Sequence, residues 1–306
     1  MKITAFVLTL LLSGGLAFTQ VTDAEKQLKT QSADSVLGWK KGGVINFNTS
    51  QTSLTNWAAG GQSSVAVGGL VSLFAHNKQE KGLWENYLDL AYGTLKQGKQ
   101  AWWKTDDKID FTSKYGYNLS KTWYLAGLVN FKTQMADGYN YPNDSVKISA
   151  FMAPGYLLGA LGFDYIPNDH FTVFIAPLTT KMTFVIDEVL SDAGAFGVDP
   201  GKSVFSEFGG YARITAKADL MENIGIQTKL DLFTNYLRNP QNIDVSWEVL
   251  LNMKINEFFA ATVTTHLLYD DDIDIEIDKN DDGVTDAKGP RIQFKEVLAI
   301  GFSLKF

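Results

Sequence analysis

Apolar and polar side chains alternate with a period of two along most of the chain beyond residue 37. In one example, Ile109, Phe111 and Tyr115 are interleaved with Asp110 and Lys114. Successive side chains of a β-strand point to opposite faces, so the pattern predicts strands with one apolar and one ionic face. The runs extend over about ten residues or more, which is long for a soluble sandwich and typical of strands that cross a membrane in a barrel. The same alternation recurs in segments 123–135, 224–235 and 243–255.

These segments predict a single all-β domain, a transmembrane antiparallel β-barrel of about twelve strands. Lipid cannot hydrogen-bond to a backbone edge, so a sheet that crosses a bilayer has to close on itself. Every second connection is brief, as at 119–121 and 221–223, whereas those at 187–203 and 270–290 are long. Short turns are periplasmic in outer-membrane barrels, so the barrel is predicted to begin on the periplasmic side. The predicted strands start near Gly42, Ser63, Leu83, Lys108, Trp123, Val146, Phe171, Phe205, Ile224, Ile243, Phe259 and Arg291.

The C-terminal segment gives the sharpest local signal. Phe294, Ile300, Phe302 and the terminal Phe306 share one face, and Lys295 lies on the other. The segment resembles the C-terminal recognition strand of outer-membrane proteins, which ends in an aromatic residue and is recognised by the barrel-insertion machinery. We therefore expect that machinery as a partner, and the lipid and lipopolysaccharide of a bacterial outer membrane as the surroundings.

Two prolines fall inside predicted strands, where each removes a hydrogen-bond donor from the ladder. The apolar side chains change from even to odd positions across Pro154, and from odd to even positions across Pro177. An extra residue that switches faces is a β-bulge, so paired bulges are predicted where the two strands meet. Such bulges either bend the wall or weaken a seam that serves as a lateral exit or a docking ridge.

Composition predicts an exported protein. Lys2, the apolar run 3–12 and the small residues that follow it are typical of a signal peptide over residues 1–19. A polar lead-in is expected at 20–37, and the barrel at 38–306. The chain has no cysteine, which excludes disulfides and a lipid-modified cysteine. The net charge of −7 disfavours nucleic acid as a partner.

Six short motifs carry a resemblance to a known family. They are WKKGG at 39–43, SQ and NWAAGG within 50–61, APLT at 176–179, YDDD at 269–272 and QFKE at 293–296. Together they resemble an outer-membrane β-barrel family of the Bacteroidota whose function is unknown. The resemblance implies the same fold and location, and it identifies no catalytic or binding residue.

The ionic strand faces are predicted to line the lumen, which leans basic because lysine and arginine outnumber carboxylates there. Eight strands leave room only for side chains and sixteen enclose a water channel, so twelve should give a narrow, partly obstructed bore. Opposed charges either brace the wall as ion pairs or form a small pore that favours anions. The inward set is Glu85, Asp89, Asp110, Asp231, Glu248, Lys108, Lys114, Lys132, Lys181, Arg213, Lys217, Lys229, Lys254, Arg291, Lys295 and Lys305.

The loop before the last strand contains a candidate calcium (Ca2+) site. Asp278, Asn280, Asp282 and Asp286 occupy the first, third, fifth and ninth positions of an EF-hand-like loop that turns at Gly283. The twelfth position holds a glycine where that pattern has a bidentate glutamate, so another carboxylate would have to complete the shell. The alternative is an acidic, solvated extracellular loop.

Signals for catalysis are weak, and we predict that the chain is not an enzyme. His76 and His170 are expected in periplasmic turns, and His266 is expected to point into the lumen without an identifiable partner. The first hypothesis for function is a narrow passive channel or transport component. The second is a non-enzymatic accessory subunit of an outer-membrane assembly for secretion, uptake or barrel insertion, and an embedded hydrolase is a remote third.

Overall fold

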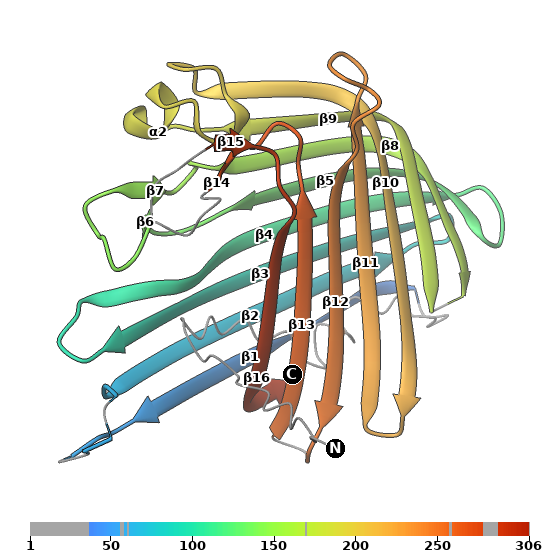
Figure 1. Ribbon diagram of the computed structural model, residues 1–306. Coiled ribbons are helices and arrows are strands. Elements are labelled where there is room, and N and C mark those ends of the chain that lie inside the picture. Colours follow the sequence, from blue (N-terminus) through green and yellow to red (C-terminus); the bar gives the residue numbers. More distant parts are fainter. Residues whose placement is uncertain are drawn as a thin grey trace, which may run out of the picture.

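Twelve antiparallel strands close into a barrel in the computed structural model of the chain. Neighbouring strands follow the chain order, and β1 closes the barrel against β16 (Figure 1). The predicted all-β barrel is therefore confirmed. The structure describes residues 37–55, 58–59, 61–168, 170–256, 259–277 and 287–305. The barrel strands are β1 (Gly38–Thr52), β2 (Ser64–Lys78), β3 (Gly82–Gln97), β4 (Trp102–Asn118), β5 (Trp123–Thr133), β8 (Gly155–Asn168), β9 (Phe171–Phe184), β10 (Val204–Met221), β11 (Ile224–Asn235), β12 (Asp244–Lys254), β13 (Phe259–Tyr269) and β16 (Gln293–Lys305).

Short and long connections alternate around the barrel, as predicted. The strand pairs β2–β3, β4–β5, β8–β9, β10–β11 and β12–β13 are joined by short turns at one end. The connections at the other end are mostly long, although β3 and β4 are joined only by residues 98–101. The long connections contain the short elements β6 (Gly138–Tyr139), β7 (Lys147–Ser149), α2 (Glu188–Asp192), the 3-10 turn η1 (Ala195–Gly197), β14 (Ile275–Ile277) and β15 (Ala287–Gly289).

Two predicted strand starts are wrong. β4 begins at Trp102, because a register shift against Gly93 and Thr94 of β3 interrupts the alternation near its start. The sixth barrel strand begins at Gly155 and not near Val146, since β6 and β7 form a separate two-stranded sheet. The parity change at Pro154 therefore marks the border between this small sheet and the barrel wall, and the bulge predicted there is absent from the described strands.

A bulge does lie at Pro177 in β9, as predicted. The register of β9 shifts against β8 between Leu161 and Phe163, and against β10 between Gly209 and Tyr211. In both ladders β9 carries one extra residue, which accommodates the missing N–H of proline. Pairing resumes on both sides of the shift, so this bulge bends the wall without opening a lateral exit.

The barrel is apolar outside and polar inside. Phe47, Leu125 and Leu161 stand on the outer face with about half of their surface exposed, at 55%, 49% and 60%. Asn46 lies in β1 beside Phe47, and Asp164 lies in β8 with Leu161. Both side chains are buried, with exposed fractions of 1% and 2%. Such an inverted distribution is stable when the outer face contacts hydrocarbon. Among the described residues, no helix is long and apolar enough to cross a membrane.

Aromatic side chains gather on the outer face near the short turns. The rings of Trp39 and Trp84 have centroids 5.7 Å apart, and those of Trp123 and Tyr165 are 4.8 Å apart. All four residues lie near the strand ends that the short turns join. Amphipathic rings at this level are typical of the girdle at a membrane–water interface.

The long connections after β5 and β9 pack against each other. Ala153, Val185 and Leu190 belong to one buried apolar cluster. The Lys147 ammonium lies 2.9 Å from the Oδ2 atom of Asp187. The Oδ1 atom of the same carboxylate caps α2 by accepting from the Leu190 N–H. The hydrogen bond from Lys147 and the capping bond lower the pKa of Asp187, so this loop contact is complete above the ordinary aspartate pKa and is lost as pH falls through the lowered value.

Three predictions about the two ends of the chain fall outside the described residues. They are the signal peptide at 1–19, the lead-in at 20–37 apart from Leu37, and the terminal Phe306. They stay predictions.

Candidate functional site in the lumen

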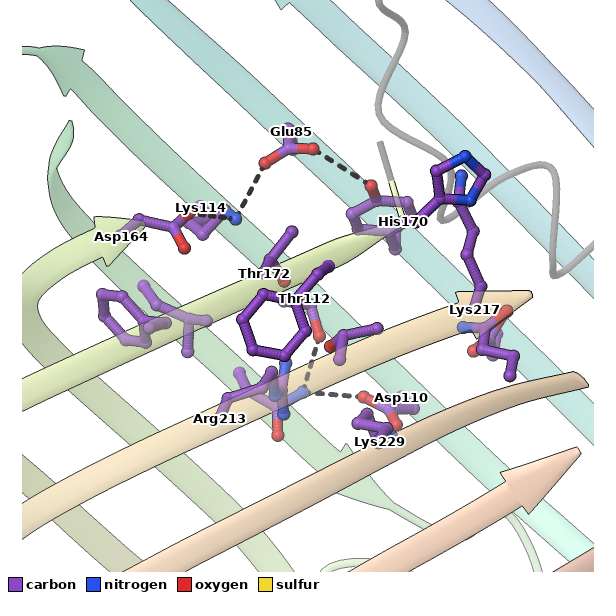
Figure 2. Close-up of a pocket in the computed structure, with 18 residues that line it drawn as sticks. Glu85, Asp110, Thr112, Lys114, Asp164, His170, Thr172, Arg213, Lys217 and Lys229 are labelled. Atoms are coloured by element: carbon purple, nitrogen blue, oxygen red, sulfur yellow. Dashed lines mark hydrogen bonds and ion pairs between the residues drawn. The ribbon is translucent and has the colours of Figure 1, made fainter. Parts of the chain in front are cut away.

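A cavity of about 120 Å³ lies inside the barrel, toward the end with the short turns. Its lining side chains come from strands on both sides of the bore and point toward one another (Figure 2). The sequence places them there because every second residue of each strand faces inward. The charged residues of the lining are Glu85, Asp89, Asp110, Asp164, Lys114, Arg213, Lys217 and Lys229.

Lys114 braces one side of this cavity. Its ammonium lies 3.0 Å from Glu85 on β3 and 2.6 Å from Asp164 on β8, beyond the intervening β5. The Tyr87 hydroxyl donates to Glu85 at 3.2 Å. One ammonium thus compensates two nearly buried carboxylates, and the brace links side chains of three strands.

Arg213 and Asp231 form a second brace on adjacent strands. The Arg213 Nε and Nη2 atoms donate to the two Asp231 carboxylate oxygens at 2.6 and 2.9 Å, a bidentate geometry. The Tyr211 hydroxyl donates to the same carboxylate at 2.8 Å. Arg213 and Asp231 lie directly opposite each other in the β10–β11 ladder, so strand register alone brings the two charges together.

Apolar side chains fill the bore beside the cavity. Phe174, Tyr211 and Phe233 belong to one buried cluster with Leu128, and their exposed fractions do not exceed 5%. The Phe174 and Tyr211 rings meet edge to face with centroids 6.2 Å apart. The lumen is therefore constricted at this level, as expected for twelve strands.

Lys181 forms the centre of a third cluster, nearer the long loops. Its ammonium lies 3.2 Å from Glu207, 2.8 Å from Asp244 and 3.1 Å from Asp270. The same ammonium lies over the Phe233 ring, 5.1 Å from the centroid. Residues of β9, β10 and β12 and the residue after β13 are thus joined by one cation.

The predicted ion pairs across the lumen are confirmed. The predicted excess of basic side chains in the lumen is offset by carboxylates outside the predicted inward set. The predicted inward set omitted the carboxylates of Asp106, Asp164, Glu207 and Asp244, which pair with the inward lysines, although Asp244 lies on the ionic face predicted for segment 243–255. Asp164 had a usable signal, because it alternates with outward-facing apolar neighbours. Two residues of the predicted inward set, Lys254 and Arg291, are exposed at or next to strand ends. The side chain of Lys305 is not among the side chains that the structure describes.

The histidines only partly match the expectation. His76 lies within β2, is buried at 3% and contacts the Tyr87 ring, so its assignment to a turn is wrong. His170 lies in the short β8–β9 turn and lines the cavity. His266 has a partner that the sequence could not identify, since its Nε2 lies 2.9 Å from the Ser246 hydroxyl on β12.

The Ser246–His266 contact resembles the nucleophile–base contact of a hydrolase, which needs a third group to orient the imidazole. Glu248 pairs with His266 across the ladder, but its carboxylate lies 2.8 Å from the Lys229 ammonium. The contact therefore fits a hydrogen bond of the barrel wall.

The four candidate calcium ligands, Asp278, Asn280, Asp282 and Asp286, lie outside the described residues. Within the described part of the chain, no group of three histidine or carboxylate side chains is arranged to hold a metal ion. Calcium binding stays a prediction.

Comparison with known proteins finds a partial match to a family without an assigned role. A family model described as "Protein of unknown function (DUF3078)" matches residues 49–139, which is less than half of the chain. This match supports the expected likeness to a family of unknown function, while an origin in the Bacteroidota stays a prediction. No curated protein matches.

Two solved structures match the chain at low identity. One is the COG4313 outer membrane channel from Pseudomonas putida F1, with 11% identity over 89% of this chain and 97% of that chain and a TM-score of 0.41. The other is the translocator domain of the autotransporter NalP from Neisseria meningitidis, with 10% identity over 93% and 92% and a TM-score of 0.35. Likenesses this distant give no information about substrate or partner.

Proposed function

We propose that the protein is a narrow passive channel of the bacterial outer membrane. This proposal rests on a closed barrel with an apolar outer face and a polar, charged lumen that contains a cavity. Only lipid around the wall and water within it suit both surfaces.

The interior limits what such a channel would pass. The ion-paired braces and the cluster around Phe174 narrow the bore, so we expect solutes to be small. Because the lumen lysines are paired with carboxylates, we expect weak selectivity between anions and cations and not a strong preference for anions.

A planar bilayer experiment tests the channel. We expect small, discrete currents below those of a sixteen-stranded porin in the same buffer. The Phe174→Ala variant should conduct more, since this buried ring fills the bore beside the cavity. Phe163→Ala is the matched control on the neighbouring strand; its ring stands outward and is 46% exposed, so the current should not change.

If the bilayer shows no current although the reconstituted barrel is folded, the channel hypothesis is wrong. That result would favour the accessory role in an outer-membrane assembly. Currents that are equal in the wild type and in both variants would place the conducting path elsewhere.

We also propose that the protein is not a hydrolase. The barrel should show no turnover of p-nitrophenyl esters above buffer, and fluorophosphonate should not label Ser246, because the Glu248 carboxylate is engaged by the Lys229 ammonium. Labelling that disappears in both Ser246→Ala and His266→Ala would contradict this and establish the pair as catalytic.

A further inference from the structure

The seam that closes the barrel is far shorter than any other. β1 pairs with β2 along its whole length, from Gly38 to Thr52. It pairs with β16 only from Val44 to Phe47, opposite Phe302 to Lys305. Beyond Phe47, β1 continues alongside β2 and leaves β16 (Figure 1). Among the described strands, β16 from Gln293 to Gly301 therefore pairs on one edge only, with β13.

This unpaired part of β16 carries a lipid-facing surface. Leu298 and Ile300 are 61% and 65% exposed on the outer face, against 38% for Phe302 in the paired part. A row of open backbone N–H and C=O groups beside such residues is costly in hydrocarbon, because lipid tails offer no hydrogen bonds. Another polypeptide segment has to satisfy this edge when the barrel lies in a bilayer.

The nearest segment that fits is β1 itself. Continuing the observed register from Phe47–Phe302 would pair Thr49 with Ile300 and Gln51 with Leu298. Because strand faces alternate in step, these pairs would all point outward. The intervening pairs would set Asn48 against Gly301 and Ser50 against Ala299.

A buried amide on β1 also lacks a partner where the two strands separate. The Asn48 side chain is only 5% exposed, and its Oδ1 accepts no hydrogen bond. It is the first inward-facing residue of β1 beyond the paired part. Strand closure would bring the backbone of β16 beside this amide.

We propose that the β1–β16 seam is a lateral gate. In a state with the longer seam, Asn48–Thr52 pair with Val297–Gly301, whereas in the structure these segments are unpaired with each other. We infer that their separation would connect the lumen with the bilayer. The inference rests on the proposed outer-membrane placement and goes beyond it, because a purely axial channel needs no opening in its wall.

The absence of cysteine allows a clean test in lipid nanodiscs. Nitroxide labels on Gln51→Cys/Leu298→Cys should give two interspin distances, one for each state. The control pair Phe47→Cys/Phe302→Cys lies in the existing ladder and should give a single short distance. A single distance for the 51/298 pair, whether short or long, would overturn the gate, since the seam would then be permanently closed or permanently open.

Disulfide formation in the same double variants checks the register of closure. The 51/298 pair should cross-link within one chain. Gln51→Cys/Phe294→Cys should not cross-link, because four residues displace the partner by about 13 Å along the strand. Cross-linking of the mismatched pair alone would overturn the proposed register.

The gate and the channel can fail separately. Two interspin distances at the seam, in a barrel that carries no current, would contradict the channel and support the gate. A single interspin distance in a conducting barrel would support the channel and contradict the gate.

Discussion

Replacing Gly162 by alanine is expected to destabilise the barrel by about 3 kcal/mol, or to block its assembly, because overpacking here meets backbone. A Cβ at this position would lie 2.0 Å from the Ile175 carbonyl oxygen and 2.4 Å from the Ala176 Cα. The neighbouring backbone cannot move away, since it belongs to the Pro177 bulge and β9 is paired on both sides. The loss would be measured as a lower urea midpoint in detergent micelles.

Gly159→Ala is the matched control, because it lies on the same strand and a Cβ there meets no atom within 4 Å. Its urea midpoint should stay close to that of the wild type. On the other side of the bulged strand, a Cβ at Gly209 would lie 1.8 Å from the Thr234 carbonyl oxygen, so Gly209→Ala should resemble Gly162→Ala. Equal midpoints for the variants at 159 and 162 would contradict the close approach.

The Lys181→Met variant is expected to lose about 3–5 kcal/mol, the usual effect of removing one partner from a buried ion pair. Methionine keeps the length of the side chain and removes the charge. Glu207, Asp244 and Asp270 would then face one another without the cation that now lies within 3.2 Å of each. Urea unfolding at neutral pH would measure the loss.

Two further variants separate lost charge from lost packing. Lys202→Met removes a lysine from an exposed loop position and should leave stability unchanged. Adding Asp244→Asn to Lys181→Met should restore part of the stability, because it removes one of the stranded carboxylates. If the added change lowers stability further, the charge-balance explanation fails.

Local patterning explains why so much of the fold could be predicted from the sequence. The alternation of apolar and polar residues, as in Ile109, Asp110 and Phe111, indicates which face of the wall each side chain occupies. This assignment depends only on the position of the residue within its own strand. The same information identified Lys114 and Arg213 as lumen residues and exposed the bulge at Pro177. It failed at Pro154, where an equal parity change arose from the border between two sheets.

The sequence by itself determined the twelve strands, the alternating loop lengths and the polar lumen, because each follows from residues close together in the chain. Only the tertiary structure decided which charges meet. Lys181 and Asp270 lie far apart in sequence and join through the curvature of the closed wall, and the Ser246–His266 contact depends on the register of two strands. The short seam between β1 and β16 was likewise invisible, since it depends on how the two ends of the sheet meet in space.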